Sequence, residues 1–148
     1  MYALLKPDYL SVEDYLFYEQ DSPIRHEYVD GELFAMAGAS DQHNEITGNL
    51  FAPLYQHLLD HECRPYANDM KIQAAQTVYY YPDVVVACDR PSTADPYYRR
   101  EPVLIIEVTS PKTEAKDRRE KLEAYKNIPS LKEYVIVGSG RIKSCKPV

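Results

Sequence analysis

The sequence predicts an α/β fold with a mixed central sheet flanked by helices, and three observations support this class. Apolar residues recur every four positions from Ile46 to Leu58, as on one face of a helix. Val103 to Val108 is an apolar run with a single acid, which is typical of a central strand. Asp30-Gly31 separates two strand-like runs, as in a hairpin. With 148 residues, 45% of them hydrophobic, we expect one domain over residues 1–148.

The N-terminal half is expected to hold a helix, a hairpin and a second helix. Ser11 can cap a helix from about Val12 to Gln20, which should end before Ser22-Pro23. The run from Arg25 to Met36 predicts a hairpin, because Asp30-Gly31 can adopt the positive φ values of a tight turn. The segment from Gly38 to Asp41 can then end the preceding strand and supply an N-cap for the second helix.

The C-terminal half is expected to supply the rest of the sheet and one further helix. The helix should begin after the cap Thr113 and run to about Asn127, because Pro129 stops it. The expected strands are Pro65 to Ala75, Val78 to Cys88, Val103 to Val108 and Glu133 to Val137.

The composition bears on where the protein resides. No segment approaches the ~18 apolar residues of a membrane span, and the N-terminus lacks a basic-then-apolar signal peptide. The three cysteines Cys63, Cys88 and Cys145 are far apart and lack metal-ligand spacing, so we expect them to be inert thiols in a reducing compartment. These features predict a cytoplasmic protein with no membrane partner.

The charge is distributed unevenly along the chain. Residues 1–111 carry 7 Lys and Arg against 18 Asp and Glu, a net −11, whereas residues 112–148 carry 10 against 5, a net +5. A basic sector beside an acidic cavity is suited to grip phosphate and to hold a cation. The alternative is that the charges between Lys112 and Lys132 only solvate a helix face.

Asp83 and Glu107 are the carboxylates for which the sequence has no obvious partner. Glu107 lies within an apolar strand, on the same face as Ile105 and Thr109, and Asp83 lies between Pro82 and a run of valines. A buried carboxylate without a partner costs several kcal/mol, so each needs a cation, a metal or a water-filled cleft. Together they can share one hard cation such as Mg²⁺. The alternative is that each acid ends its strand near solvent and pairs with a Lys or Arg.

Lys121 is the cation that the predicted last helix offers to this site. Asp117, Lys121 and Tyr125 are spaced by four, so they form one stripe that can face the end of the preceding strand. An ammonium beside a metal can orient water or stabilise phosphoryl charge. The alternative is a surface pair between Asp117 and Lys121, worth only ~0.3–0.5 kcal/mol.

These residues fall into an ordered pattern that resembles the PD-(D/E)XK restriction-endonuclease-like superfamily. Within it the chain is similar to the Uma-type family of restriction endonucleases, formerly a domain of unknown function and expanded in cyanobacteria. The resemblance spans about residues 8–138. The matching blocks are His26 to Leu33, His43, Tyr81 to Val84, Ile106 to Thr113, Asp117 with Lys121 and Tyr125, and Glu133 to Val137.

The resemblance implies a core of order α-β-β-β-α-β and a divalent-metal-dependent DNA endonuclease. It implies that Asp83 and Glu107 bind Mg²⁺ or Mn²⁺, with the backbone carbonyl of Val108 as a third ligand. The usual lysine two residues after the acid is replaced by Thr109, so Lys121 is the natural substitute.

Glu27 and His43 also fall on family-typical positions. The resemblance implies that they act as a further metal ligand or position a water molecule. For His43 the alternative is a helix-start histidine that bonds to the backbone. His57 and His61, also spaced by four, lack a third ligand and are expected on an exposed face.

Two departures from the family pattern leave the function open. Without a lysine at position 109, the chain can instead be a catalytically inactive nuclease-fold module that binds nucleic acid or protein. Residues 139–148 form a short basic tail where the family continues with further strands. An edge left by missing strands would invite partner pairing, which predicts a homodimer.

Overall fold

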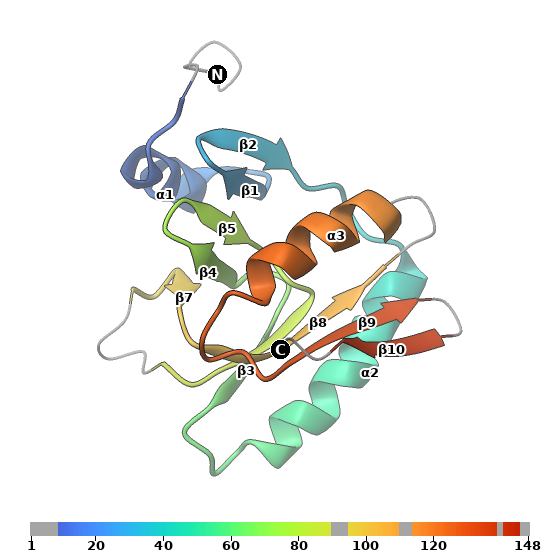
Figure 1. The fold of residues 1–148 in the computed structure, drawn as a ribbon. Helices are drawn as coiled ribbons and strands as arrows, with labels where there is room; N and C mark the ends of the chain where they lie inside the picture. The colour runs from blue at the N-terminus through green and yellow to red at the C-terminus, as the bar shows by residue number, and fades with distance from the viewer. Residues whose placement is uncertain (1–8, 90–94, 110–113, 139–140, 146–148) are drawn as a thin grey trace.

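The computed structural model describes residues 9–89, 95–109, 114–138 and 141–145, with side chains described at all of these except 114–118 and 141–145 (Figure 1). None of the helices in these ranges has the length and apolar content that a membrane span requires. The helices are α1 (Val12–Asp21), α2 (Asp41–His57) and α3 (Glu114–Tyr125). The strands are β1 (His26–Val29), β2 (Glu32–Ala35), β3 (Arg64–Ala67), β4 (Lys71–Ala75), β5 (Val78–Tyr80), β6 (Val84–Ala87), β7 (Tyr98–Arg99), β8 (Pro102–Val108), β9 (Glu133–Gly138) and β10 (Arg141–Cys145).

The strands form two mixed sheets, which confirms the α/β class. The first sheet has the order β2-β1-β5-β4-β7 and the second has the order β10-β9-β8-β6-β3. The pairs β4–β7 and β8–β9 are parallel, and the other pairs are antiparallel. The division into two sheets differs from the single sheet that the sequence suggested.

Two stretches expected as continuous strands are each divided between the sheets. The prediction of one strand from Pro65 to Ala75 was wrong, because Asn68 adopts a φ of +64° and turns the chain from β3 into β4. The prediction of one strand from Val78 to Cys88 was also wrong, because the chain breaks at Pro82, which has no N–H for a ladder. Asp83 consequently lies immediately before β6.

The second sheet is buried on both faces, as its apolar strands predict. The consecutive residues Ile105 and Ile106 of β8 point to opposite faces of the sheet. Ile106 packs with the α2 residues Ile46 and Leu50, whereas Ile105 packs in the cluster that contains Tyr125 of α3. The helices α2 and α3 therefore cover opposite faces of β8, and α3 also contacts the first sheet through β4.

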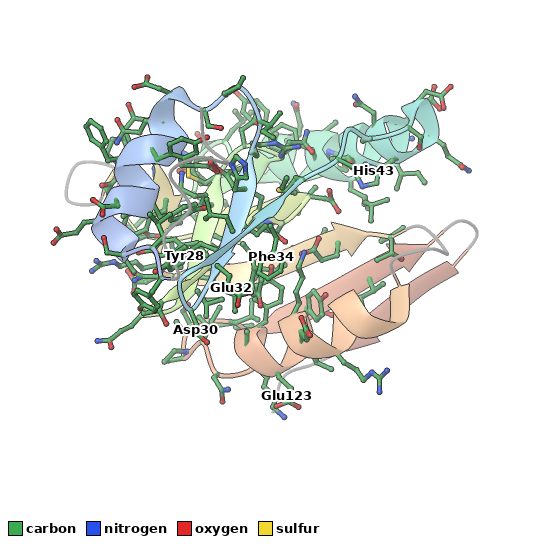
Figure 2. All side chains as sticks on the ribbon, turned by 90° about the horizontal axis from the view of Figure 1, so that it is seen from above. Tyr28, Asp30, Glu32, Phe34, His43 and Glu123 are labelled. Atoms are coloured by element: carbon green, nitrogen blue, oxygen red, sulfur yellow. A yellow bond between two sulfur atoms is a disulfide. The ribbon has the colours of Figure 1, made fainter. Side chains whose placement is uncertain are left out.

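The N-terminal helix and hairpin form as predicted. The Ser11 side chain caps α1 by accepting from the Asp14 N–H. Asp30 and Gly31 have φ values of 47° and 93°, which join β1 to β2 in a tight turn. In Figure 2 this hairpin, marked by the labelled Tyr28 and Phe34, lies between α1 and α3. Its inner side packs in a tyrosine cluster, which consists of Tyr15, Tyr28, Tyr79 and Tyr98.

The cysteines and the C-terminal tail differ from expectation. Cys63 and Cys88 form a disulfide with a Cα–Cα distance of 4.0 Å, so the prediction that they are inert thiols was wrong. The antiparallel pairing of Arg64 with Ala87 brings the two cysteines opposite each other, a contact that their spacing in sequence does not reveal. The cysteine argument for a reducing compartment therefore loses its basis.

The expectation that a short tail replaces the family's further strands was also wrong, since residues 141–145 form β10 and pair with β9. This strand is one edge of the second sheet in the part of the chain that the structure describes, and β3 is the other. Its side chains lie outside the described set, and so does the predicted helix cap Thr113.

Candidate active site

Asp83 and Glu107 face each other across two neighbouring strands. The antiparallel register pairs Val84 of β6 with Ile106 of β8, so the next residues along, Asp83 and Glu107, are brought opposite. Asp83 Oδ2 accepts a hydrogen bond of 2.7 Å from the Val108 N–H. The side chain of Glu107 also interacts with Asp83 and lowers its pKa, against the raising effect of burial. The sequence-predicted pair therefore lies together at one end of the second sheet.

Lys121 reaches this pair from α3. Its Nζ lies 3.3 Å from Glu27 Oε1 and 3.9 Å from Glu107 Oε1. The Tyr125 hydroxyl, one turn further along the helix, donates to Glu107 Oε1 at 3.1 Å. The Lys121 side chain is only 9% exposed, so it is not part of a surface ion pair. The side chain of Asp117, the third member of the stripe, lies outside the described set.

Glu27 and His43 join the same group from β1 and α2, respectively. Glu27 is on β1, and its Oε2 accepts from the Tyr81 N–H at 2.9 Å. His43 lies in the first turn of α2 (Figure 2), where its own N–H donates to the cap Ser40 at 3.1 Å. The His43 ring points toward Asp83, and its Nε2 lies 3.2 Å from Asp83 Oδ1. Its ring therefore contacts a carboxylate, whereas the alternative from the sequence gave it only a backbone bond.

A cavity of about 190 Å³ opens at the point where these elements meet. The lining includes Asp83, Glu107, Lys121 and His43, together with Val108 and Thr109. Thr109 thus faces the cavity at the position where the family pattern has lysine, and Lys121 enters the same space from the helix. His57 and His61 stack on each other at the far end of α2, with ring centroids 5.4 Å apart, and they are not in the cavity lining.

The electrostatics of the cavity favour a cation. Burial raises the pKa of Asp83 and also that of Glu27. The charge of Glu107 raises the pKa of Glu27 further, whereas Lys121 lowers both. Three carboxylates therefore converge on one lysine ammonium in a partly desolvated space. An additional positive charge would stabilise their ionised forms.

The oxygen donors are chemically suited to a hard divalent ion. Among the described residues no three side chains of the His, Cys, Asp and Glu types are arranged as a ready-made metal set. Asp83 and Glu107 would therefore supply two oxygens, and the Val108 carbonyl is the predicted third donor. Mg²⁺ commonly binds one or two carboxylates and keeps several waters, so this donor set fits such an ion.

Among the cavity-lining residues that sequence reasoning missed are Arg25 and Tyr81. Each directly adjoins a residue of interest: Arg25 precedes the His26-Glu27 block, and Tyr81 precedes Pro82-Asp83. Tyr81 belongs to a block quoted for the family resemblance, but nothing in the local pattern distinguishes it from a core tyrosine. Proximity in the sequence to Glu27 and Asp83 was the available indication.

Comparison with known proteins places this fold in a family. The family described as "Putative restriction endonuclease", Uma2, matches residues 12–146. The chain belongs to the Uma2 family. Two Synechocystis relatives support this membership. The uncharacterized protein slr1290 is 38% identical over 135 residues, which cover 90% of this chain and 71% of the relative. The uncharacterized protein sll1609 is 33% identical over 131 residues, which cover 86% and 74%.

A solved structure shares the fold of this Uma2 chain. It is the crystal structure of a protein from Anabaena variabilis described as "a putative nuclease belonging to DUF820". The TM-score is 0.73 over 93% of this chain and 80% of that chain, with 11% sequence identity. At this identity the likeness establishes the fold, and the expected nuclease-like fold is confirmed.

Proposed function

We propose that this Uma2 protein is an endonuclease that hydrolyses DNA phosphodiester bonds with a bound Mg²⁺ or Mn²⁺. Asp83, Glu107 and the backbone carbonyl of Val108 would hold the ion. The observation that carries the proposal is the convergence of Asp83, Glu107 and Lys121 on one cavity in a nuclease-like fold, with Glu27 paired to Lys121. Three carboxylates, Asp83, Glu107 and Glu27, share the single ammonium of Lys121, and this excess around Lys121 supports a divalent cation.

The chain's own residues hold the proposed ligands in fixed orientations. The Val108 N–H and the His43 ring each contact a different oxygen of Asp83. The Tyr125 hydroxyl holds one oxygen of Glu107. A divalent ion, when bound, makes water a better nucleophile and neutralises phosphate charge. Orientation of the ligands in advance lowers the cost of forming such a site.

Lys121 is the proposed replacement for the lysine of the family motif. Thr109 cannot carry a positive charge, but the Lys121 ammonium enters the same cavity from α3. In this position it would hold an attacking water and stabilise the charge that develops on the phosphoryl oxygens. Glu27 Oε1 lies 3.3 Å from the Lys121 Nζ and holds the ammonium near the cavity.

The test is nicking of supercoiled plasmid in Mg²⁺ or Mn²⁺ by the wild type and by Asp83→Asn and Glu107→Gln. We expect metal-dependent nicking by the wild type, abolished by EDTA and reduced at least ~100-fold in either variant. Glu123→Gln is the matched control, because Glu123 is an exposed carboxylate on α3 that pairs with Lys126 outside the cavity. Absence of nicking on varied DNA substrates, together with no Mg²⁺ or Mn²⁺ binding in calorimetry, would refute the proposal.

A second candidate function is a catalytically inactive module that binds nucleic acid or protein. The observation in its favour is Thr109, which leaves the family's motif without its lysine. This module would retain DNA in a manner that is sensitive to salt but independent of metal. Asp83→Asn would leave that retention unchanged, which distinguishes the module from the nuclease.

A further inference from the structure

Arg25 is a cation in the cavity lining for which the proposed chemistry has no use. The other two basic side chains of the lining are held by carboxylates: Lys121 by Glu27 and Glu107, and His43 by Asp83. Among the described residues, the carboxylate paired with Arg25 is that of Asp69, with Nη1 and Oδ1 3.6 Å apart. The Asp69 side chain is 85% exposed, so water and salt screen this pair strongly.

The Arg25 guanidinium is held in place by uncharged contacts. It lies over the ring of Tyr81, 5.5 Å from the centroid, and its Nη1 donates to the carbonyl of Asn68. The ring is itself fixed, since the Tyr81 hydroxyl donates to Glu19 Oε2 at 3.2 Å and Lys71 Nζ lies 3.5 Å from that hydroxyl. Tyr81 thus gives Arg25 a rigid platform.

The same contacts tie Arg25 to the proposed metal ligand. Asn68 accepts from Arg25 through its carbonyl, and its own N–H donates to the Asp83 carbonyl at 3.0 Å. Its φ of +64° is what lets the β3–β4 turn present both groups to these two partners. Arg25 and Asp83 are consequently fixed relative to each other through one residue.

The donors that remain on Arg25 suit a phosphate. Among the described residues, the polar contacts of Arg25 use Nη1, which leaves the planar edge formed by Nε and Nη2. An arginine edge of this kind binds phosphate oxygens in a two-pronged manner, which a lysine cannot reproduce. The side chain is 36% exposed, so a ligand in the cavity can reach it.

We propose that Arg25 binds a backbone phosphate of DNA that flanks the phosphate to be cleaved. This inference rests on the proposed nuclease function and adds a substrate-positioning residue to it. Arg25 fixes where the strand lies relative to Asp83, so its loss impairs binding of DNA more than the chemical step.

The experiment measures binding of a short fluorescein-labelled DNA duplex at several salt concentrations, with nicking kinetics alongside. Binding is measured in Ca²⁺, which supplies a cation without the strict octahedral geometry of Mg²⁺. For Arg25→Gln we expect a rise in Kd of about ten-fold and a salt slope shallower by about 0.9, the loss of one phosphate contact. KM in nicking should rise while kcat changes less.

Two further variants separate the charge from the fold. Arg25→Lys keeps the charge, so the salt slope should match the wild type while Kd rises only about three-fold. Arg100→Gln is the matched control, because Arg100 also lies 5.5 Å from a tyrosine ring centroid, that of Tyr98, but lines a different depression with Gln73 and Gln76. It should bind and nick as the wild type does.

Each outcome is decisive. Wild-type binding by Arg25→Gln overturns the inference and leaves the proposed nuclease standing. Equal losses in Arg25→Gln and Arg25→Lys overturn it too, since a structural role would not distinguish charge. DNA binding that depends on Arg25 without any nicking supports the inference and refutes the hydrolysis. A wild-type protein that binds no DNA overturns both.

Discussion

Replacement of Lys121 by methionine tests the charge balance of the cavity. Methionine keeps the apolar stem and removes an ammonium that lies 3.3 Å from Glu27 and 3.9 Å from Glu107, with only 9% of the side chain exposed. Removal of one partner from a buried ion pair typically costs ~3–5 kcal/mol, because a buried charge is left uncompensated. We expect the lower end, about 3 kcal/mol at pH 8, because the remaining carboxylates can take up a proton.

The loss of stability should depend on pH. Burial already raises the pKa of Glu27 above its ordinary value of 4.5, and removal of the Lys121 charge raises that pKa further. A carboxyl with a raised folded-state pKa destabilises the fold above that pKa, where it must be ionised, and the penalty disappears as the pH falls toward the unfolded value. The difference between Lys121→Met and wild type should therefore shrink from pH 8 to pH 5.

Urea unfolding at pH 8 and pH 5 measures this effect, and plasmid nicking measures the catalytic effect. We expect the nicking kcat to fall ~10²–10³-fold. Lys126→Met is the control, because Lys126 pairs with Glu123 in an exposed i,i+3 contact and should change stability by less than ~0.5 kcal/mol. Wild-type stability at pH 8, an equal loss at both pH values, or wild-type nicking by Lys121→Met would each refute the reasoning.

Three other predictions concern the fold. Gly31→Ala should destabilise the chain by about 1–3 kcal/mol in urea unfolding, because Gly31 has a φ of +93° and an added Cβ would collide with the Tyr9 ring. The control is Gly48→Ala, which should leave stability unchanged or raise it, because Gly48 lies on α2 with open space around it. The disulfide between Cys63 and Cys88 has a sequence separation of 25, so its removal by double alanine substitution should cost ~3 kcal/mol of stability and make Tm insensitive to reductant. If reductant lowers the Tm of the wild type and of the double variant equally, this prediction is wrong. We also expect a homodimer, which a monomer at micromolar concentration in analytical ultracentrifugation would refute.

Much of the fold was predictable because local chemistry decides it. Ser11 caps α1, Ser40 caps α2, and Asp30-Gly31 forms the hairpin turn, each from the residue types that such positions prefer. The break at Pro82 follows from a residue that cannot donate to a ladder, but the break at Asn68 was not predictable in the same way, since the residues on both sides of it retain strand character. The assignment of each half to a different sheet depends on tertiary pairing.

The candidate site also contains residues that the sequence indicated and residues that only the tertiary structure reveals. Asp83 and Glu107 are conspicuous as acids in apolar surroundings, the spacing by four along the last helix pointed to Lys121, and the family resemblance pointed to Glu27 and His43. Arg25 has no such context, because its contact with Asn68 joins residues 43 positions apart. The pairing of Cys63 with Cys88 was missed for the same reason, since it follows from the register of β3 and β6.

The central claim is that Asp83 and Glu107 share one divalent metal ion. A crystal soaked in Mn²⁺, with anomalous diffraction collected to locate the ion, tests it most directly. We predict one strong anomalous peak in contact with both carboxylates and the Val108 carbonyl, with the Lys121 ammonium within reach of a metal-bound water. An empty cavity at saturating Mn²⁺, or a peak bound only elsewhere on the chain, would contradict the account.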